Sequence, residues 1–261
     1  MARIYEYQGK EILRNKGILV PKGSLVTNPE EAKKAAAEVG KPVVLKAQVW
    51  ATGRFKSGGI KFVDNPDEAE KTARELIGSI VKGLVVDRIL VEEQLAIDKE
   101  YYVGIIVNDS VKVKGPTLIF STEGGVGVEE VAARNPERVV TMDINYVQGL
   151  GSAEVEQFVG SLPFDYVLSR ELAQELAGII GNLYQAFVEC DARAAEINPL
   201  VLTRGKHFYA ADCRFTIDDN SVFRHPEFGI LLPRDMTREP TELEKIAWQI
   251  EEEDYRGTGY F

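Results

Sequence analysis

Two oxygen-bearing side chains, Asn198 and Asp212, stand in a segment whose pattern predicts a β-hairpin. Apolar runs at 196–202 and 207–212 are separated by the glycine-containing segment 203–206, a length typical of hairpin connections. In such a hairpin Asn198 and Asp212 would lie near one another on neighbouring strands. An amide oxygen and a carboxylate suit Mg²⁺, which takes oxygen ligands and often shares them with substrate phosphates. A hairpin with ordinary surface polar residues fits the same pattern, so these residues alone leave both interpretations open.

The glycine-rich segment 51–59 is a second candidate, because cations surround it. The cations are Lys46, Arg54 and Lys56, and the glycines are Gly53, Gly58 and Gly59. Backbone N–H groups that glycine leaves accessible, together with positive charge, could hold a polyphosphate. A flexible hairpin loop with a solvated basic rim is the alternative interpretation. Segment 122–129 is also rich in glycine, but it is acidic and therefore a poor cradle for phosphate.

Short elements with clear start signals must position these side chains. Asn28-Pro29 and Asn65-Pro66 each supply a helix N-cap and a first helical residue, with a Glu three positions after the Asn. Residues 20–82 are therefore predicted to form a small α+β unit. In the first 98 residues, helices are expected at 5–16, 29–39 and 66–80, and strands at 24–27, 43–45, 60–63 and 89–92.

The rest of the chain predicts an antiparallel sheet covered by a long amphipathic helix at 169–189. Strands are expected at 99–107, 111–113 and 117–121, mixed loop and short helix over 137–168, a loop at 216–220 and a last helix at 240–253. Pro199 has no N–H and is expected at a strand end or edge, which would place Asn198 at a rim open to a cleft. Glu92, at the end of an apolar strand, could accept a hydrogen bond from adenine or ribose, although a solvent-facing glutamate fits equally.

The composition is that of an ordinary soluble globular protein of 261 residues, with 44% hydrophobic and 28% charged residues. A formal charge of −10 argues against broad nucleic-acid binding, so an anionic ligand would need a locally positive pocket. Cys190 and Cys213 make neither a disulfide framework nor a metal quartet, and buried thiols are expected. No signal peptide and no apolar run near the ~20 residues of a membrane span is found, which predicts a cytoplasmic protein.

Motifs in a fixed order along the whole chain carry a family resemblance. They are Glu6-Tyr7-Gln8-Gly9-Lys10, Lys46-Ala47-Gln48-Val49, Gly53-Arg54, Lys56, Lys99-Glu100, Ser121-Thr122-Glu123-Gly124-Gly125-Val126, Glu196-Ile197-Asn198-Pro199-Leu200 and Phe223-Arg224. In this order they resemble the β subunit of succinyl-CoA synthetase, a member of the ATP-grasp superfamily. Less closely, they are similar to the synthetase half of ATP-citrate lyase.

The resemblance implies an α+β ATP-grasp fold of two α+β subdomains with the nucleotide cleft between them. The ATP-grasp domain would cover 1–235, with a small subdomain at about 21–98 and a large one formed by 1–20 plus 99–235. Residues 236–261 would form a helix and a linker toward a carboxy-terminal, flavodoxin-like CoA-ligase domain. That domain is expected to be absent from this chain.

The resemblance also implies a role for each site residue. Lys46 and Arg54 would contact the phosphates and act in catalysis, and Gly53-Arg54-Phe55 would form the loop over them. Glu92, Leu95 and Glu100 would hold adenine and ribose, Asn198 and Asp212 would bind Mg²⁺, and Glu196 would act near a phosphorylated histidine. Thr52 and Phe55 stand where the family usually has glycine, and Trp50 is unusual at its position. Because phenylalanine lacks the backbone freedom of glycine, the loop geometry is in question.

The implied reaction joins a carboxylic acid to coenzyme A at the expense of ATP or GTP, with Mg²⁺. It runs through an acyl-phosphate and a phosphohistidine on a separate α subunit, which would also supply most of the coenzyme A site. His207 and His225 stand in no motif for that nucleophile and are expected to be structural. Succinate is the expected acid, with malate and citrate as alternatives. A carboxylate–amine ligase and a non-catalytic nucleotide-binding or assembly module are the rival functions.

Overall fold

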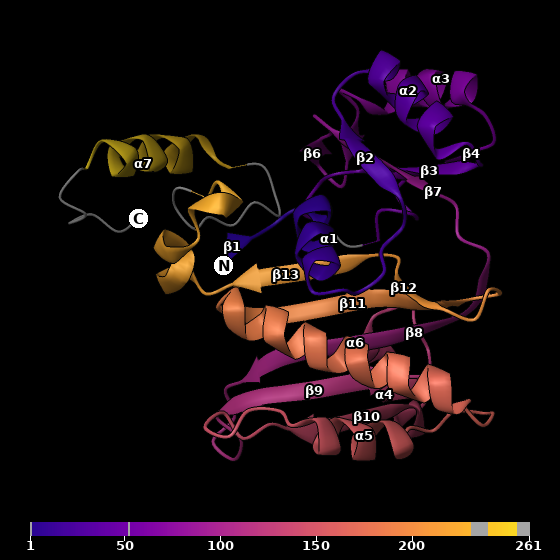
Figure 1. The fold of residues 1–261 in the computed structure, drawn as a ribbon. Coiled ribbons are helices and arrows are strands. Elements are labelled where there is room, and N and C mark those ends of the chain that lie inside the picture. The colour runs from indigo at the N-terminus through magenta and orange to yellow at the C-terminus, as the bar shows by residue number, and fades with distance from the viewer. Residues whose placement is uncertain (1, 52, 231–239, 255–261) are drawn as a thin grey trace.

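The computed structural model describes residues 2–51, 53–230 and 240–254 of the chain. It contains two main antiparallel sheets, each with helices of its own (Figure 1). The smaller sheet has four strands in the order β2-β7-β3-β4, and the larger has seven strands. This arrangement confirms the predicted α+β class.

The four-stranded sheet is built from β2 (Gly23–Val26), β3 (Val43–Ala47), β4 (Ile60–Val63) and β7 (Ile89–Glu93). Helices α2 (Pro29–Val39) and α3 (Pro66–Leu76) lie side by side over it, and β5 (Ile80–Val81) pairs with β6 (Leu84–Val85) (Figure 1). Both predicted helix starts are confirmed, because the Asn28 and Asn65 side chains each accept a 2.9 Å hydrogen bond from the backbone N–H three residues on.

The seven-stranded sheet has the order β1-β13-β11-β8-β9-β10, and β12 pairs with β11 off this path. Its strands are β1 (Ala2–Arg3), β8 (Ile97–Asn108), β9 (Gly115–Ser121), β10 (Val139–Asp143), β11 (Ala192–Thr203), β12 (Phe208–Ala210) and β13 (Cys213–Ile217). The long helix α6 (Arg170–Glu189) lies along one face and buries Leu176, Ile180 and Leu183 against it.

The remaining helices are short or lie at the ends of the chain. They are α1 (Glu6–Asn15), α4 (Val128–Arg134), α5 (Ser152–Gly160), α7 (Glu242–Glu253) and the 3₁₀ turns Pro136–Arg138, Asp219–Arg224 and Pro226–Phe228. Helix α1 packs against strand β13 of the larger sheet and against helix α6. It lies between the larger sheet and the smaller one (Figure 1). Across the described ranges, no helix combines the length and apolar character that a membrane span requires.

The two sheets bury two separate apolar cores, one around α6, β8 and β11 and one around α2, α3, β3 and β7. On this basis we propose to retain the predicted division, and we call residues 21–98 the small lobe and residues 1–20 with 99–235 the large lobe. The predicted ending at 257–261 lies outside the described residues.

The structure corrects several sequence-based assignments. Segment 111–113, which was predicted to be a strand, is a turn. Its apolar residue Val111 is 88% exposed and is therefore not buried in either core. Strand β10 forms where mixed loop and short helix were expected, and it pairs only with β9 at the edge of the sheet. Strand β13 begins before the predicted loop at 216–220 and includes its first two residues. Pro199 lies within β11, a central strand, where the pairing with β8 shifts register between Ile197 and Leu200.

Candidate functional site

Six charged side chains from both lobes converge beside α1. We call them the charge cluster: Glu6 and Lys10 from α1, Lys46 from β3, Arg54 from the loop after β3, Glu92 from β7, and Asp212 from the connection between β12 and β13. Five of these side chains are buried, and that of Asp212 is 29% exposed. The cluster therefore joins the lobes where Asp212 reaches solvent.

Arg54 spans the junction between the lobes. Its Nη2 donates to Glu6 Oε2 and to Asp212 Oδ2, both at 2.7 Å, and its Nη1 donates to the Ala47 carbonyl at 2.9 Å. Lys46 Nζ lies 3.0 Å from Glu6 Oε1 and donates to the Ala211 carbonyl at 2.5 Å. The structure thus brings one predicted phosphate-binding cation, Arg54, onto a predicted metal ligand, Asp212, which lies 158 positions away. It brings the other, Lys46, onto the carbonyl of the residue before Asp212.

The other half of the cluster lies deeper. Lys10 Nζ donates to both oxygens of Glu92 at 2.6 Å and lies 2.8 Å from Glu6 Oε1. Lys46 Nζ also lies 3.0 Å from Glu92 Oε2. Glu92 is 1% exposed, and in this arrangement its carboxylate pairs with Lys10 and Lys46. Leu95 lies in the connection between β7 and β8, and Glu100 is exposed on β8, so the adenine and ribose contacts predicted for all three remain a proposal.

The charges in the cluster balance, with three cations against three carboxylates. Burial alone would raise the pKa of Glu6, but Lys10, Lys46 and Arg54 together hold that pKa well below its usual value. Burial likewise acts to lower the pKa of Lys46, yet Glu6 and Glu92 outweigh it and the pKa is raised. Burial raises the pKa of Asp212, and Glu6 adds to the rise although Arg54 opposes it. At Arg54 too, Asp212 and Glu6 outweigh burial and raise the pKa, so Lys46 and Arg54 both stay protonated.

Acid is expected to weaken the fold through Glu6. Because its folded-state pKa lies below the ordinary 4.5, the unfolded chain binds a proton that the folded chain does not. The stability that Glu6 contributes is complete above about pH 5 and is lost as the pH falls toward the folded-state pKa. Urea titrations should show the free energy of unfolding falling with acid more steeply in the wild type than in Glu6→Gln. Equal slopes would contradict this expectation.

Asn198 lies beside Asp212, as the hairpin prediction required. The Asn198 N–H donates to the Asp212 carbonyl at 3.0 Å, and β11 pairs with β12 from Leu200 onward. The Asn198 side chain, however, holds the loop before α4: its Oδ1 accepts from Gly125 N and its Nδ2 donates to Val126 O, both at 2.8 Å. The two predicted ligands therefore have different side-chain partners in this structure.

The donor chemistry of this pair fits Mg²⁺, with one carboxylate and one amide oxygen on adjacent backbone segments. An amide oxygen that accepts one hydrogen bond retains a second lone pair, so the Gly125 contact and a metal bond are compatible. Asp212 would exchange its contact with Arg54 for the ion, which would release the guanidinium toward phosphate oxygens. Within the described residues, this region included, no group of three or more His, Cys, Asp or Glu side chains could hold a metal ion.

The predicted phosphate loop forms a compact turn. Gly53 and Gly58 have positive φ, 69° and 77°, and the Gly59 N–H donates to the Arg54 carbonyl at 2.8 Å. Phe55 does not have a positive φ, so phenylalanine fits its position without backbone strain. Its side chain is 64% exposed and meets the Phe62 ring edge-on at 6.2 Å. Thr52 lies outside the described residues.

Glu196 has a partner that the sequence did not suggest. Tyr102 Oη donates to Glu196 Oε1 at 2.8 Å, and Arg214 Nε lies 3.7 Å from Glu196 Oε2. Burial and the Glu196 carboxylate raise the pKa of Tyr102, so its hydroxyl stays a donor. Glu6 and Lys10 were also without an assigned role, although their i,i+4 spacing on one helix predicts a contact.

The histidines and cysteines are arranged as structural residues. His225 is buried, bonds Asp191 and Glu227 through its two ring nitrogens, and stacks on Phe228. His207 is exposed, with Nδ1 3.5 Å from a carboxylate oxygen of Glu175. Cys190 and Cys213 are free and buried, which confirms the expectation of buried thiols.

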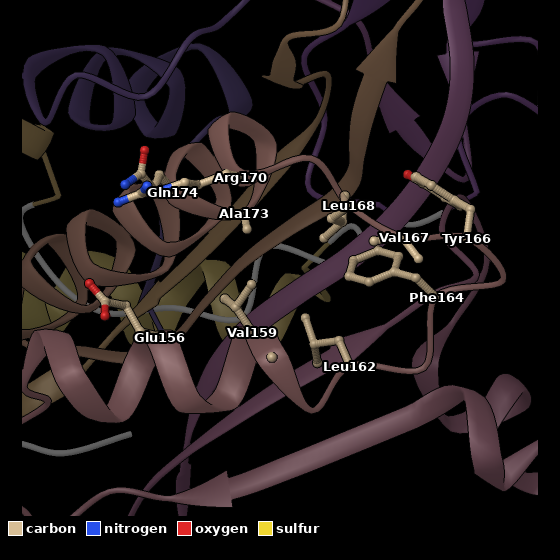
Figure 2. A pocket seen from close by; sticks show the side chains of 11 residues that line it. Glu156, Val159, Leu162, Phe164, Tyr166, Val167, Leu168, Arg170, Ala173 and Gln174 are labelled. Atoms are coloured by element: carbon tan, nitrogen blue, oxygen red, sulfur yellow. The ribbon is translucent and has the colours of Figure 1, made fainter.

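A cavity of about 580 Å³ lies away from the charge cluster. Its wall is formed by α5, the segment that follows it and the start of α6, with apolar side chains such as Leu162 and Phe164 along it (Figure 2). Arg170 and Gln174 lie next to one another on α6, and Glu156 lies apart from them on α5 (Figure 2). No residue predicted for the site lines this cavity.

Comparison with known proteins decides the family. A family model described as an ATP-grasp domain matches residues 3–202. The chain belongs to the ATP-grasp family. The ATP-grasp chain is 42% identical over 246 residues to the β subunit of an ADP-forming succinate–CoA ligase of Methanothermobacter thermautotrophicus, covering 94% of this chain and 63% of that protein. It is 43% identical over 242 residues to the β subunit of a GDP-forming succinate–CoA ligase of Thermus thermophilus, covering 92% and 62%. The predicted resemblance is confirmed.

Solved structures show the same ATP-grasp fold. An acetyl-coenzyme A synthetase of Ca. Korarchaeum cryptofilum, in complex with coenzyme A and Ca-AMPCP, matches with a TM-score of 0.68 at 23% identity, over 84% of this chain and 94% of that chain. ATP citrate lyase of Methanothrix soehngenii, in complex with citrate and coenzyme A, matches with a TM-score of 0.69 at 20% identity, over 97% and 60%. The ATP-grasp chain spans 62–63% of the length of the two curated relatives described above.

Proposed function

We propose that this chain is the nucleotide-binding part of an ADP-forming acid–CoA ligase of the succinate–CoA ligase type. In this role it transfers the γ-phosphoryl group of Mg·ATP to a histidine of a partner subunit during acyl-CoA formation. The observation that carries the proposal is the contact of Arg54 with Asp212, and of Lys46 with the neighbouring Ala211 carbonyl, across the two lobes. Identity above 40% to two succinate–CoA ligase β subunits supports it.

Each residue has a physical role in this proposal. Lys46 and Arg54 donate to phosphate oxygens and so stabilise the charge that spreads over the transferring group. Asp212 and Asn198 hold Mg²⁺, which when bound neutralises charge on the phosphates. Gly53-Arg54-Phe55 covers the phosphates, and Glu196, oriented by Tyr102, acts beside the partner's histidine. Leu95 and Glu100 contact adenine and ribose, and Glu92 would join them by exchanging its contacts with Lys10.

The acceptor of the phosphoryl group belongs to a partner, because neither described histidine suits the task. His225 is buried between two carboxylates, and His207 lies 3.5 Å from the Glu175 carboxylate on the large lobe. We therefore assign the phosphohistidine and the coenzyme A site to an α subunit. Succinate is the favoured acid, with malate and citrate as alternatives. We place the protein in the cytoplasm.

Phosphoryl transfer to the partner tests this function directly. The partner subunit is first identified by its co-purification with this chain. The two are then co-expressed, and the complex is incubated with Mg²⁺ and with either [γ-³²P]ATP or [γ-³²P]GTP. We expect an acid-labile, alkali-stable label on a histidine of the partner, and the better donor identifies the nucleotide. No label, together with ATP-dependent coupling of an acid to an amine, would favour a carboxylate–amine ligase instead.

Replacing Phe55 tests whether its side chain obstructs the nucleotide. Since Phe55 has ordinary φ and an exposed ring, Phe55→Gly should change the affinity for Mg·ATP by less than about threefold, which is under ~1 kcal/mol. Calorimetry provides the measurement, and Phe62→Ala serves as a control that removes the same ring contact from the neighbouring strand. A large gain in affinity would show that phenylalanine blocks the site. Undetectable binding by the wild type and by all variants would support an assembly module.

A further inference from the structure

Every short polar contact of the Glu6 side chain involves a cation or an amide of the junction between the lobes. Its Oε1 faces Lys46 Nζ at 3.0 Å and Lys10 Nζ at 2.8 Å, and its Oε2 accepts from Arg54 Nη2 at 2.7 Å and from Gln48 Nε2 at 3.3 Å. One carboxylate thus bridges the two cations assigned to phosphate, with one oxygen on each. The side chain is 3% exposed, so water does not compete for these contacts.

The large lobe fixes the position of this carboxylate. Glu6 opens α1, and Gly9 in the same helix lies so close to β13 that an added Cβ would come within 2.7 Å of Cys213 Sγ and 3.1 Å of the Phe215 ring. The helix start is also held, because Tyr5 N donates to Gln8 Oε1 at 2.9 Å. Lys46 and Arg54, by contrast, belong to the small lobe. Glu6 is therefore a fixed point against which two side chains of the other lobe are set.

We propose that Glu6 is a positioning residue that sets the spacing of the Lys46 ammonium and the Arg54 guanidinium for a triphosphate chain. The inference rests on the proposed function. A triphosphate needs both cations at matched distances, and loosening either one costs orientation as well as contact. An anion with a single phosphorus needs only one of them. This difference separates a positioning role from a purely electrostatic one.

In Glu6→Gln, the change in charge and the loss of positioning are expected to shift Mg·ATP affinity in opposite directions. Glu6→Gln leaves three cations against two carboxylates in the charge cluster, so the local potential becomes more positive. If only the potential mattered, every anion would bind more tightly. If the spacing matters, Mg·ATP should bind more weakly despite the added positive charge, while inorganic phosphate should bind as well as before or better.

The experiment is calorimetry of the full chain with Mg·ATP and, separately, with inorganic phosphate. For Glu6→Gln we expect the Kd for Mg·ATP to rise about tenfold and the Kd for phosphate to stay equal or fall. Glu6→Asp keeps the charge but withdraws the carboxylate by one methylene, so it should also raise the Kd for Mg·ATP. The matched control is Glu93→Gln, which removes a neighbouring carboxylate that pairs with Lys41 at the surface and leaves the cluster intact.

The outcomes separate this inference from the function on which it rests. Tighter or unchanged Mg·ATP binding by both Glu6 variants, with normal binding by the wild type, would overturn the positioning role alone. A parallel loss of Mg·ATP and phosphate binding would indicate a merely structural residue and would overturn it as well. A wild type that binds no Mg·ATP would overturn the proposed function together with this inference. If Glu6→Gln fails to fold, the charge-conserving Glu6→Asp decides.

Discussion

Asp212→Asn is expected to lower the affinity for Mg·ATP by about 100-fold or more, close to 3 kcal/mol. The substitution keeps the size of the side chain but removes the charge that would face Mg²⁺ and that now pairs with Arg54 at 2.7 Å. A neutral amide is a weaker ligand for a hard divalent cation than a carboxylate. The measurement is calorimetry with ATP in the presence of Mg²⁺ and again in the presence of EDTA.

The measurement with EDTA distinguishes a role of Asp212 in metal binding from a general loss of structure. Without Mg²⁺, the wild type and Asp212→Asn should bind ATP with similar, low affinity. The control is Asp109→Asn, which removes an equally short surface contact, 2.7 Å to Arg193, outside the site. An Asp212→Asn variant that binds Mg·ATP as well as the wild type would show the metal assignment to be wrong.

Lys10→Met should destabilise the chain more than any surface substitution. Lys10 is 2% exposed and neutralises two buried carboxylates, so its removal leaves Glu6 and Glu92 with only Lys46 and Arg54 for compensation. Removing one partner of a buried ionic group costs roughly 3–5 kcal/mol, because a charge is left unpaired away from water. Urea unfolding should show a lower midpoint with an unchanged slope.

A second substitution and a surface control sharpen this expectation. Glu92→Gln introduced into the Lys10→Met background should restore part of the loss, because it removes the carboxylate that has lost its partner. Lys33→Met breaks surface contacts with Asp67, which is 83% exposed, and Glu70, which is partly exposed, and it should cost no more than about 1 kcal/mol. A Lys10→Met variant as stable as Lys33→Met would contradict the balance of charges described here.

Local signals predicted much of the fold correctly. The Asn-Pro starts located α2 and α3, and the hydrophobic face of 169–189 located α6, because caps and helical periodicity act over a few residues. Strand β13 was missed although its sequence alternates, with apolar Cys213, Phe215 and Ile217 separated by polar Arg214 and Thr216. The end of α3 was placed four residues late; Gly78, with φ of 83°, follows the true end.

The charge cluster lay beyond the reach of a single sequence. Its contacts join positions that are 48, 82 and 158 residues apart, and no local pattern specifies which distant carboxylate a lysine or an arginine meets. Family resemblance named Lys46, Arg54 and Asp212 as ligand-binding residues. It did not indicate that Glu6, one turn before Lys10, would bridge Lys46 and Arg54. The partner of a buried charge is decided by packing, which only the folded chain shows.

The balance of three cations and three carboxylates also bears on how a nucleotide would arrive. The chain carries a formal charge of −10, and a neutral cluster adds no long-range attraction to offset it. Free ATP would approach against a repulsive field that salt would screen beyond about 8–10 Å. A magnesium-complexed nucleotide carries less negative charge and would be repelled less. Discrimination for the metal complex therefore begins during diffusional encounter, before any contact is made.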